Sequence, residues 1–304
     1  MNINEPRSLE SKNGSSRKGM KDLKTVYLTH GSECSLPKPE PCVMAMGFFD
    51  GVHVAHQQVI LEAKKIARKR KIKLAVMTFF PHPREVLNLG KEKMNYLTPL
   101  EVKLDRFSKL GVDMVYVIKF DSVFAELSPK EFIDTYVTGL GVKHAVAGFD
   151  FTYGQKGKGT MKTMSTDGEG KFLVTVISKL DYKGQKISST FIRNLLSHGE
   201  VSEIASYLGD YYETRGKVVS HYHSRIGKRF YYDIVAYPYY TLPSDGIYAV
   251  EMSIGDYVYP GSALVYANKI KLSLDGHMKG PNGENVRLKW IRSLDVEKVQ
   301  LRQI

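Results

Sequence analysis

The sequence is poor in cysteine, since Cys34 and Cys42 are the only two among its 304 residues. Two cysteines permit one disulfide but no disulfide framework, so we expect a reduced protein in the cytoplasm. Long apolar runs are also missing, and no stretch approaches the roughly 18 residues that a membrane-spanning helix requires. Residues 1–20 lack the apolar core of a secretory signal, and we expect residues 1–23 to form a polar, disordered tail.

Acidic residues are outnumbered by basic ones, 32 against 44, which gives a net charge of +12 at pH 7. Such a charge favours polyanions as partners: nucleic acid, anionic lipid or phosphate-bearing small molecules. The densest basic cluster, KKIARKRKIK at residues 64–73, falls at the end of an expected helix, where cations complement the helix dipole. It has no interleaved aromatic residues and belongs to no nucleic-acid-binding motif. The charge therefore leaves nucleic acid open as a partner without favouring it.

Short β-rich runs alternate with helical stretches from Lys24 to about Ser178. In residues 55–71 apolar side chains recur at helical spacing, and residues 99–111 and 128–141 carry further helical patterns with Ser128 as an expected N-cap. This alternation predicts a parallel sheet with right-handed crossovers, whose ligands bind beyond the carboxyl ends of the strands. The predicted strands are KTVYL (24–28), CVMAMG (42–47), KLAVMTFF (73–80), DMVYVIKF (113–120) and KHAVAGF (143–149).

The pattern changes after about Asp210, where β-rich segments are separated by glycine, proline and aspartate. No long helical pattern intervenes, so residues 210–304 are expected to form a second domain, a small all-β barrel. Residues 187–209 between the two domains are expected to form two short connecting helices that break at Gly199. The barrel segments are TRGKVVSHYHSR (214–225), RFYYDIVAYPYY (229–240), GIYAVEMSIGDYVYP (246–260), ALVYANKIKLSL (263–274) and VRLKWIRSL (286–294).

The stretch GFFDGVHVAH, residues 47–56, joins a predicted strand to a predicted helix. His53 and His56 are three residues apart, so both can lie on one side of the helix N-terminus, where unpaired N–H groups attract anions. Gly47 and Gly51 would let a phosphate approach the main chain. Zinc binding is less favoured, because the His-Glu-x-x-His spacing is missing and no other Cys/His cluster supplies ligands. The remaining alternative is one surface histidine and one core histidine without a function.

Three further stretches carry polar or glycine residues where strands end or helices begin. TFFPHPREV (78–86) predicts a stiff loop, either a binding loop or a simple sheet edge. AGFDFTYGQKGKGT (147–160) is a glycine-rich loop with two lysines that suits a phosphate or a planar ring. ISSTFIR (187–193) crowds hydroxyl groups at a helix start with an arginine one turn on, which is typical either of a capping cluster or of a phosphate clamp.

Taken together, these four stretches make the chain resemble the bacterial flavin synthetases, in which an FMN adenylyltransferase domain precedes a riboflavin kinase domain. The matching segments are GFFDGVHVAH, TFFPHP, AGFDFTYG and ISSTFIR. The resemblance implies an α/β fold, a Rossmann-like nucleotidylyltransferase domain followed by a small barrel. It assigns residues 24–186 to the adenylyltransferase, residues 187–209 to the connecting helices and residues 210–304 to a kinase-like barrel.

The resemblance also implies the reaction: FMN attacks the α-phosphorus of ATP, pyrophosphate leaves, and FAD forms with the assistance of Mg²⁺. No protein side chain is implied as a metal ligand. The residues implied as catalytic are His53, His56 and Arg193. Those implied to bind ATP are Gly47, Phe48, Phe49, Asp50, Gly51, Ser188, Ser189 and Thr190, and those implied to shape the flavin site are Pro81, His82, Pro83, Asp150 and Phe151.

The chain departs from the family pattern in both domains. Ala55 replaces a glycine between the two histidines, and Phe80 replaces a residue that is usually acidic. The Gly-Phe-Pro-Thr-Ala-Asn stretch of the kinase is missing, and residues 261–274 hold no carboxylate that could act as its base. The sequence therefore predicts a barrel without kinase activity. Two alternatives stay open: a bifunctional kinase and adenylyltransferase, or a non-catalytic regulator that binds flavin or RNA.

Overall fold

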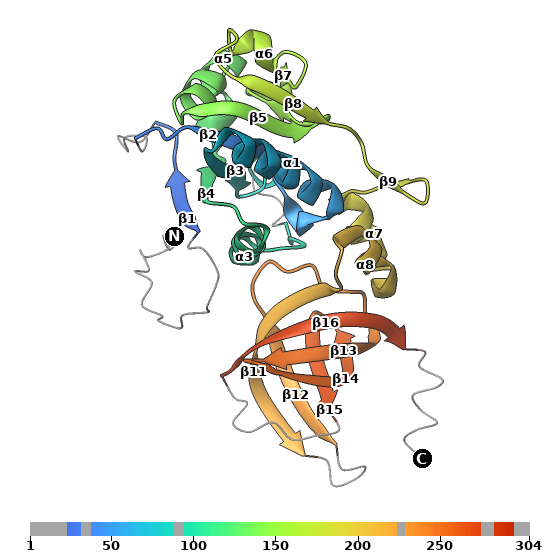
Figure 1. Cartoon of the computed structure of the whole chain (residues 1–304). Helices are drawn as coiled ribbons and strands as arrows, with labels where there is room; N and C mark the ends of the chain where they lie inside the picture. The colour runs from blue at the N-terminus through green and yellow to red at the C-terminus, as the bar shows by residue number, and fades with distance from the viewer. Residues whose placement is uncertain (1–22, 32–37, 88–93, 224–228, 275–282, 295–304) are drawn as a thin grey trace.

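The structure is a computed structural model that describes residues 23–31, 38–87, 94–223, 229–274 and 283–294. An α/β domain precedes a β-barrel, and two helices, α7 and α8, lie between them (Figure 1). This arrangement confirms the predicted fold class. Apart from Leu23, the tail expected at residues 1–23 lies outside the described residues, as does Cys34. No helix among the described residues is both long and apolar enough to cross a membrane.

The α/β domain is built on a six-stranded parallel sheet in the order β1-β4-β3-β2-β5-β8. All five predicted strands are present, and the prediction missed a sixth strand, β8, which pairs with β5 at the sheet edge. The central strand β2 is buried along its whole length. The strands are β1 (Lys24–Leu28), β2 (Cys42–Met46), β3 (Lys73–Phe80), β4 (Met114–Lys119), β5 (Val142–Gly148) and β8 (Leu173–Ile177).

Helices cover both faces of this sheet because the side chains of each strand alternate between the faces. Val43 and Ala45 of β2 pack with α1 (Val54–Arg70) and α3 (Leu100–Leu110), whereas Met44 packs with the opposite helical layer. In that layer α5 (Pro129–Phe132) continues as the π-helix η2 (Ile133–Thr138), and Ser128 is the N-cap of α5, as predicted. The remaining short helices are η1 (Asp50–Val52), α2 (Pro83–Leu87), α4 (Ser122–Ala125), η3 (Gln155–Gly157) and α6 (Met164–Asp167).

Two short hairpins and two helices complete the first part of the chain. The hairpins are β6 (Thr152–Tyr153) with β7 (Gly159–Thr160), and β9 (Asp181–Tyr182) with β10 (Gln185–Lys186). The helices α7 (Ser189–Ser197) and α8 (Val201–Leu208) are separated at Gly199, whose φ of 73° is left-handed. Glycine adopts this conformation without steric cost, which explains the break there.

The barrel is closed and antiparallel in the order β11-β12-β15-β14-β13-β16. Trp290 is fully buried in it and donates from its indole N–H to the Thr214 hydroxyl at 3.1 Å. The segment predicted at residues 246–260 forms parts of two strands, because Gly255 (φ 56°) turns the chain. The strands are β11 (Tyr212–His223), β12 (Phe230–Ala236), β13 (Gly246–Ile254), β14 (Tyr257–Tyr266), β15 (Lys269–Leu274) and β16 (Asn285–Leu294).

One apolar core joins the barrel to the connecting helices. It contains side chains of α7, α8 and the barrel strands together with Leu97, which comes from the α/β domain. Arg215 of β11 reaches Asp105 of α3 at 2.5 Å, and Tyr96 forms a parallel bridge with Tyr240. The barrel therefore packs directly against the segment that precedes α3 (Figure 1).

Candidate active site

The turn between β2 and α1 has an unusual backbone. Phe49, Gly51 and Val52 adopt left-handed φ angles of 57°, 82° and 44°. Such angles strain a β-branched residue like Val52, and strain of this kind gathers at functional sites when the surrounding structure enforces it. At Gly51 a Cβ would also lie only 3.0 Å from Leu97. The close approach and the positive φ together explain why glycine stands at this position.

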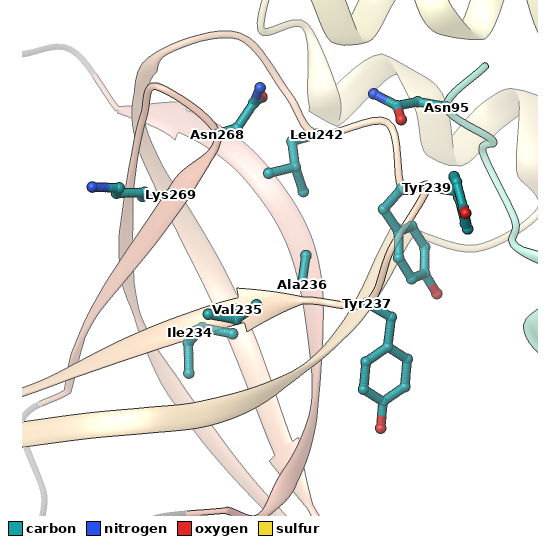
Figure 2. Close-up of a pocket in the computed structure, with 10 residues that line it drawn as sticks. Asn95, Ile234, Val235, Ala236, Tyr237, Tyr239, Leu242, Asn268 and Lys269 are labelled. Carbon is teal, nitrogen blue, oxygen red and sulfur yellow. The ribbon is translucent and has the colours of Figure 1, made fainter. Parts of the chain in front are cut away.

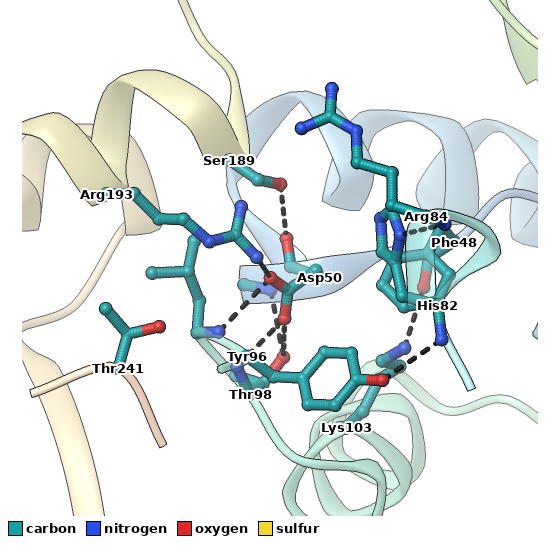
Figure 3. Close-up of polar contacts among 12 residues, drawn as sticks. Phe48, Asp50, His82, Arg84, Tyr96, Thr98, Lys103, Ser189, Arg193 and Thr241 are labelled. Carbon is teal, nitrogen blue, oxygen red and sulfur yellow. Dashed lines mark hydrogen bonds and ion pairs between the residues drawn. The ribbon is translucent and has the colours of Figure 1, made fainter. Parts of the chain in front are cut away.

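Asp50 anchors this turn with a fully buried carboxylate. It accepts hydrogen bonds from the backbone N–H groups of Leu97 at 3.1 Å and Thr98 at 3.0 Å (Figure 3). Only 3% of Asp50 is exposed, so these donors replace water around the charge. The Thr98 hydroxyl accepts from the Gly51 N–H at 2.9 Å, which ties the same two segments together once more.

Arg193 of α7 completes the surroundings of Asp50. Its guanidinium forms an ion pair with the Asp50 carboxylate, and the Ser189 hydroxyl donates to the Asp50 carbonyl at 2.8 Å (Figure 3). The Nε of Arg193 is buried and has no hydrogen-bond partner in the described structure. A buried donor without a partner is costly, so a ligand acceptor beside it would relieve that cost.

The two histidines lie together at the start of α1, as their spacing predicts. His53 is the N-cap, its Nδ1 accepts from the His56 N–H at 3.2 Å, and the two rings stack with centroids 3.5 Å apart. Because Nδ1 of His53 acts as an acceptor, the proton of the neutral ring is on Nε2, which is left as a donor. Nδ1 of His56 is buried without a partner among the described residues.

Burial keeps both imidazoles neutral at physiological pH. It lowers the pKa of His53 to about 4, although the nearby Asp50 carboxylate opposes the change. Burial and the neighbouring His53 hold the pKa of His56 well below its ordinary range. The site therefore presents neutral hydrogen-bond donors, beside the positive end of the α1 dipole, to an incoming anion.

A second loop, between β3 and α2, approaches the same turn. The His82 ring meets the Phe48 ring edge-on at 4.2 Å, and the His82 N–H donates to the Tyr96 hydroxyl at 3.0 Å. The Tyr96 hydroxyl in turn donates to the carboxylate of Glu85. Burial lowers the pKa of His82 to about 4. Tyr96 thus holds the loop around His82 next to Phe48.

A model of the FAD synthetase family matches residues 35–191, just over half of the 304-residue chain. The chain belongs to the FAD synthetase family. It is similar to a bifunctional riboflavin kinase/FMN adenylyltransferase of Bacillus subtilis (strain 168), with 46% identity over 79% of this chain and 76% of the relative. The protein of that name from Listeria monocytogenes is 38% identical over 88% of both chains.

A solved structure supports the same arrangement of domains. The crystal structure of a macrolide-efflux protein from Streptococcus pneumoniae superposes with a TM-score of 0.77 and 27% sequence identity. The match covers 90% of this chain and 100% of that one, so it includes both the α/β domain and the barrel.

The structure brings most of the expected site residues of this FAD synthetase together around one turn and places others at its margin. Ser188 caps α7 by accepting from the Phe191 N–H at 3.2 Å, and Thr190 is exposed in the first turn of that helix. Asp150 is exposed and pairs with Lys186 at 2.8 Å, whereas Phe151 packs against the core of the α/β domain. Pro81 follows a cis peptide bond, and Pro83 opens α2.

Sequence reasoning missed Lys103, a buried cation beneath the turn. Its ammonium donates to the Phe48 carbonyl at 2.8 Å and lies 4.1 Å from the centroid of the Phe48 ring. Burial lowers its pKa to about 8. A signal existed, since Lys103 lies three residues after Leu100 and four before Phe107, on the apolar face of α3. Thr78, Tyr96 and Thr98 were also missed.

The described residues contain no cluster of three or more His, Cys, Asp and Glu side chains suited to a metal ion. A cavity of about 260 Å³ lies elsewhere, at the end of the barrel near Asn95 (Figure 2). None of the site residues expected from the sequence lines it. The cavity is lined by Asn95, Ile234, Val235, Ala236, Tyr237, Tyr239, Tyr240, Leu242, Asn268 and Lys269.

Proposed function

We propose that this FAD synthetase is an FMN adenylyltransferase, which transfers the AMP moiety of ATP to FMN and releases pyrophosphate. Family membership and the names of the relatives support the synthesis of FAD from FMN and ATP. The observation that carries the proposal is the convergence of the stacked His53 and His56 with the Asp50–Arg193 pair at the N-terminus of α1. This is a site built for a polyphosphate.

In the proposed reaction a phosphate oxygen of FMN forms a bond to the α-phosphorus of ATP. The bond from that phosphorus to the oxygen bridging the α- and β-phosphates breaks, and the electron pair leaves with pyrophosphate. His53, through the N–H of Nε2, would donate to the α-phosphate, and Arg193 would contact the departing phosphates. Asp50 orients the guanidinium through a buried ion pair, so the charge is in place before the substrate arrives.

The flavin would lie on the side of the loop around His82, with the aromatic face of Phe48 next to it. Asp150, which pairs with Lys186 at 2.8 Å, and Phe151 are proposed to shape the far edge of that site. Phe149, which is 47% exposed beneath the ammonium of Lys186, offers a further aromatic surface there.

We propose that Mg²⁺ enters with ATP rather than in a protein cage. The carboxylate oxygens of Asp50 already accept from Leu97, Thr98 and Arg193, which leaves them poorly suited to ligate a metal. Mg²⁺ commonly keeps several waters and binds through substrate phosphates. When bound with ATP it would supply neutralisation of phosphate charge.

We further propose that the barrel lacks riboflavin kinase activity, although the curated relatives are named as bifunctional. The Pro-Thr-Ala-Asn sequence is missing from the chain. On the outer face of the barrel, the Asp233 carboxylate of β12 lies 4.0 Å from the ammonium of Lys271, its partner residue in β15. Losing the residues that position the metal and the base costs several powers of ten in rate, since each such group contributes about 10²-fold or more.

The experiment incubates the purified protein with ATP and Mg²⁺ plus either FMN or riboflavin, and separates the flavins by chromatography. We expect FAD from FMN and no FMN from riboflavin. FMN formed from riboflavin would support the bifunctional alternative, and no turnover of either flavin would leave the non-catalytic regulator.

We also propose a cytoplasmic location, and the buried, free thiol of Cys42 is consistent with it.

A further inference from the structure

The connection between β12 and β13 reaches out of the barrel to the segment that supports Asp50. The Tyr96 N–H donates to the Tyr239 carbonyl at 2.5 Å, and the Thr241 N–H donates to the Tyr96 carbonyl at 2.9 Å. These bonds are main-chain bonds of a short parallel bridge (Figure 3 shows Thr241 and Tyr96). We call residues 239–244 the barrel strap.

The strap binds Tyr96, which directly precedes the two residues that donate to the Asp50 carboxylate. Leu97 and Thr98, which follow Tyr96, are the residues whose N–H groups bind the carboxylate. The hydroxyl of Tyr96 also accepts from the His82 N–H. A shift of Tyr96 would therefore move the partner of Arg193 and the loop of the flavin side together.

The barrel and helix α7 both bind the strap. The hydroxyl of Tyr212 in β11 donates to the Thr241 carbonyl at 2.6 Å, and the Ser244 N–H donates to the Leu196 carbonyl of α7 at 2.9 Å. The cavity of about 260 Å³ borders the strap at Tyr239, Tyr240 and Leu242 (Figure 2). Tyr240 is buried and Leu242 packs against the joint core, so both packing and hydrogen bonds hold the strap in place.

We propose that the barrel serves adenylyl transfer as a positioning element, through the strap and its main-chain bonds to Tyr96. This inference rests on the proposed function and extends it to a domain that lacks the kinase residues. None of the strap contacts requires a kinase residue, so the barrel keeps this role without phosphorylating riboflavin. Tyr212 and Thr241 are positioning residues, since both act on the site through Tyr96.

Two variants and one matched control test the proposal in the full chain. Thr241→Pro removes the N–H that binds the Tyr96 carbonyl, and Tyr212→Phe removes the hydroxyl that binds the strap. Tyr237→Phe is the control, because that hydroxyl donates to exposed Asn285 of β16 at 2.7 Å rather than to the strap. The readouts are kcat and kcat/KM for FMN, and hydrogen exchange of the Leu97 and Thr98 amides without substrate.

We expect Thr241→Pro to lower kcat and kcat/KM by about tenfold and Tyr212→Phe by about threefold, as the loss of one hydrogen bond predicts. Both should speed exchange at Leu97 and Thr98, and Tyr237→Phe should change neither readout. If Thr241→Pro fails to fold, Tyr212→Phe still decides. Unchanged exchange and kinetics in Tyr212→Phe would overturn the proposal. A different outcome is that the wild-type protein makes no FAD while the variants still exchange faster at Leu97 and Thr98. That outcome would overturn the proposed function and leave the strap with a structural role alone.

Discussion

The replacement of His53 separates the structural role of this residue from its proposed chemical one. His53 caps α1 through Nδ1, and only 4% of it is exposed. Asparagine is a strong N-cap with the same acceptor function, whereas alanine removes the cap at a cost of about 1 kcal/mol. We therefore expect His53→Asn to unfold in urea close to the wild type, and His53→Ala to lose about 1 kcal/mol of unfolding free energy or more, since it also leaves a cavity.

Activity should not follow this ranking by stability, because both replacements remove the N–H donor of Nε2 and should therefore lower kcat alike. Loss of one preorganised donor to a developing charge costs about 10² to 10³ in kcat. The assay measures FAD formed from FMN and ATP together with urea unfolding, and exposed His198 replaced by asparagine is the control. A His53→Asn enzyme with kcat within threefold of the wild type would refute the chemical role. Equal stability of the two His53 variants would refute the capping role.

Three further predictions concern charge in and beneath the site. Because the pKa of buried His53 is about 4 and its ordinary value is 6.5, the unfolded chain binds more protons between these pH values. The unfolding free energy of the wild type should thus fall by about 3 kcal/mol as pH drops from 6.5 to 4. The urea midpoint of His53→Asn should fall less over the same pH range. Equal pH profiles of the two proteins would contradict this prediction. Asp50→Asn leaves the guanidinium of Arg193 without its buried partner, so unfolding free energy should drop by about 3 kcal/mol and kcat/KM about 100-fold; an unaltered enzyme would show that the ion pair is dispensable. Lys103→Met should change the unfolding free energy by less than about 1 kcal/mol, because the desolvation cost of the buried ammonium offsets its favourable contacts. It should lower kcat/KM about tenfold, because the Phe48 carbonyl loses a donor. Wild-type kinetics in this variant would show that Lys103 does not act on the site.

Local patterns in the sequence were sufficient to predict the strands and helices that carry the site. The periodicity of α1 and the spacing of His53 and His56 follow from residues close together in the chain, so both could be predicted. The turn at Gly255 was missed because continuous β-rich composition hides a hairpin inside one run. Strand β8 was missed although four of its five residues, LVTVI, are β-branched.

The main-chain donors to Asp50 could not be predicted, because they belong to a segment that meets Asp50 only in the folded chain. Leu97 and Thr98 offer main-chain N–H groups, which carry no signature in the sequence. The strap contacts at Tyr96 are likewise main-chain bonds between domains. Lys103 differs, since a charged residue in an apolar helical stripe can be recognised before the structure is known.

The buried thiol at the start of the central strand β2 gives this protein an internal reporter. Cys42 lies in β2 between β3 and β5 with no exposed surface, and burial raises the pKa of its thiol to about 12. The thiolate is the form that alkylating reagents modify. Cys42 packs in the core beneath η2, so a reagent reaches this thiol only when that packing opens. The rate of labelling at Cys42, located by peptide mapping, would measure how often the α/β domain opens, without an engineered cysteine.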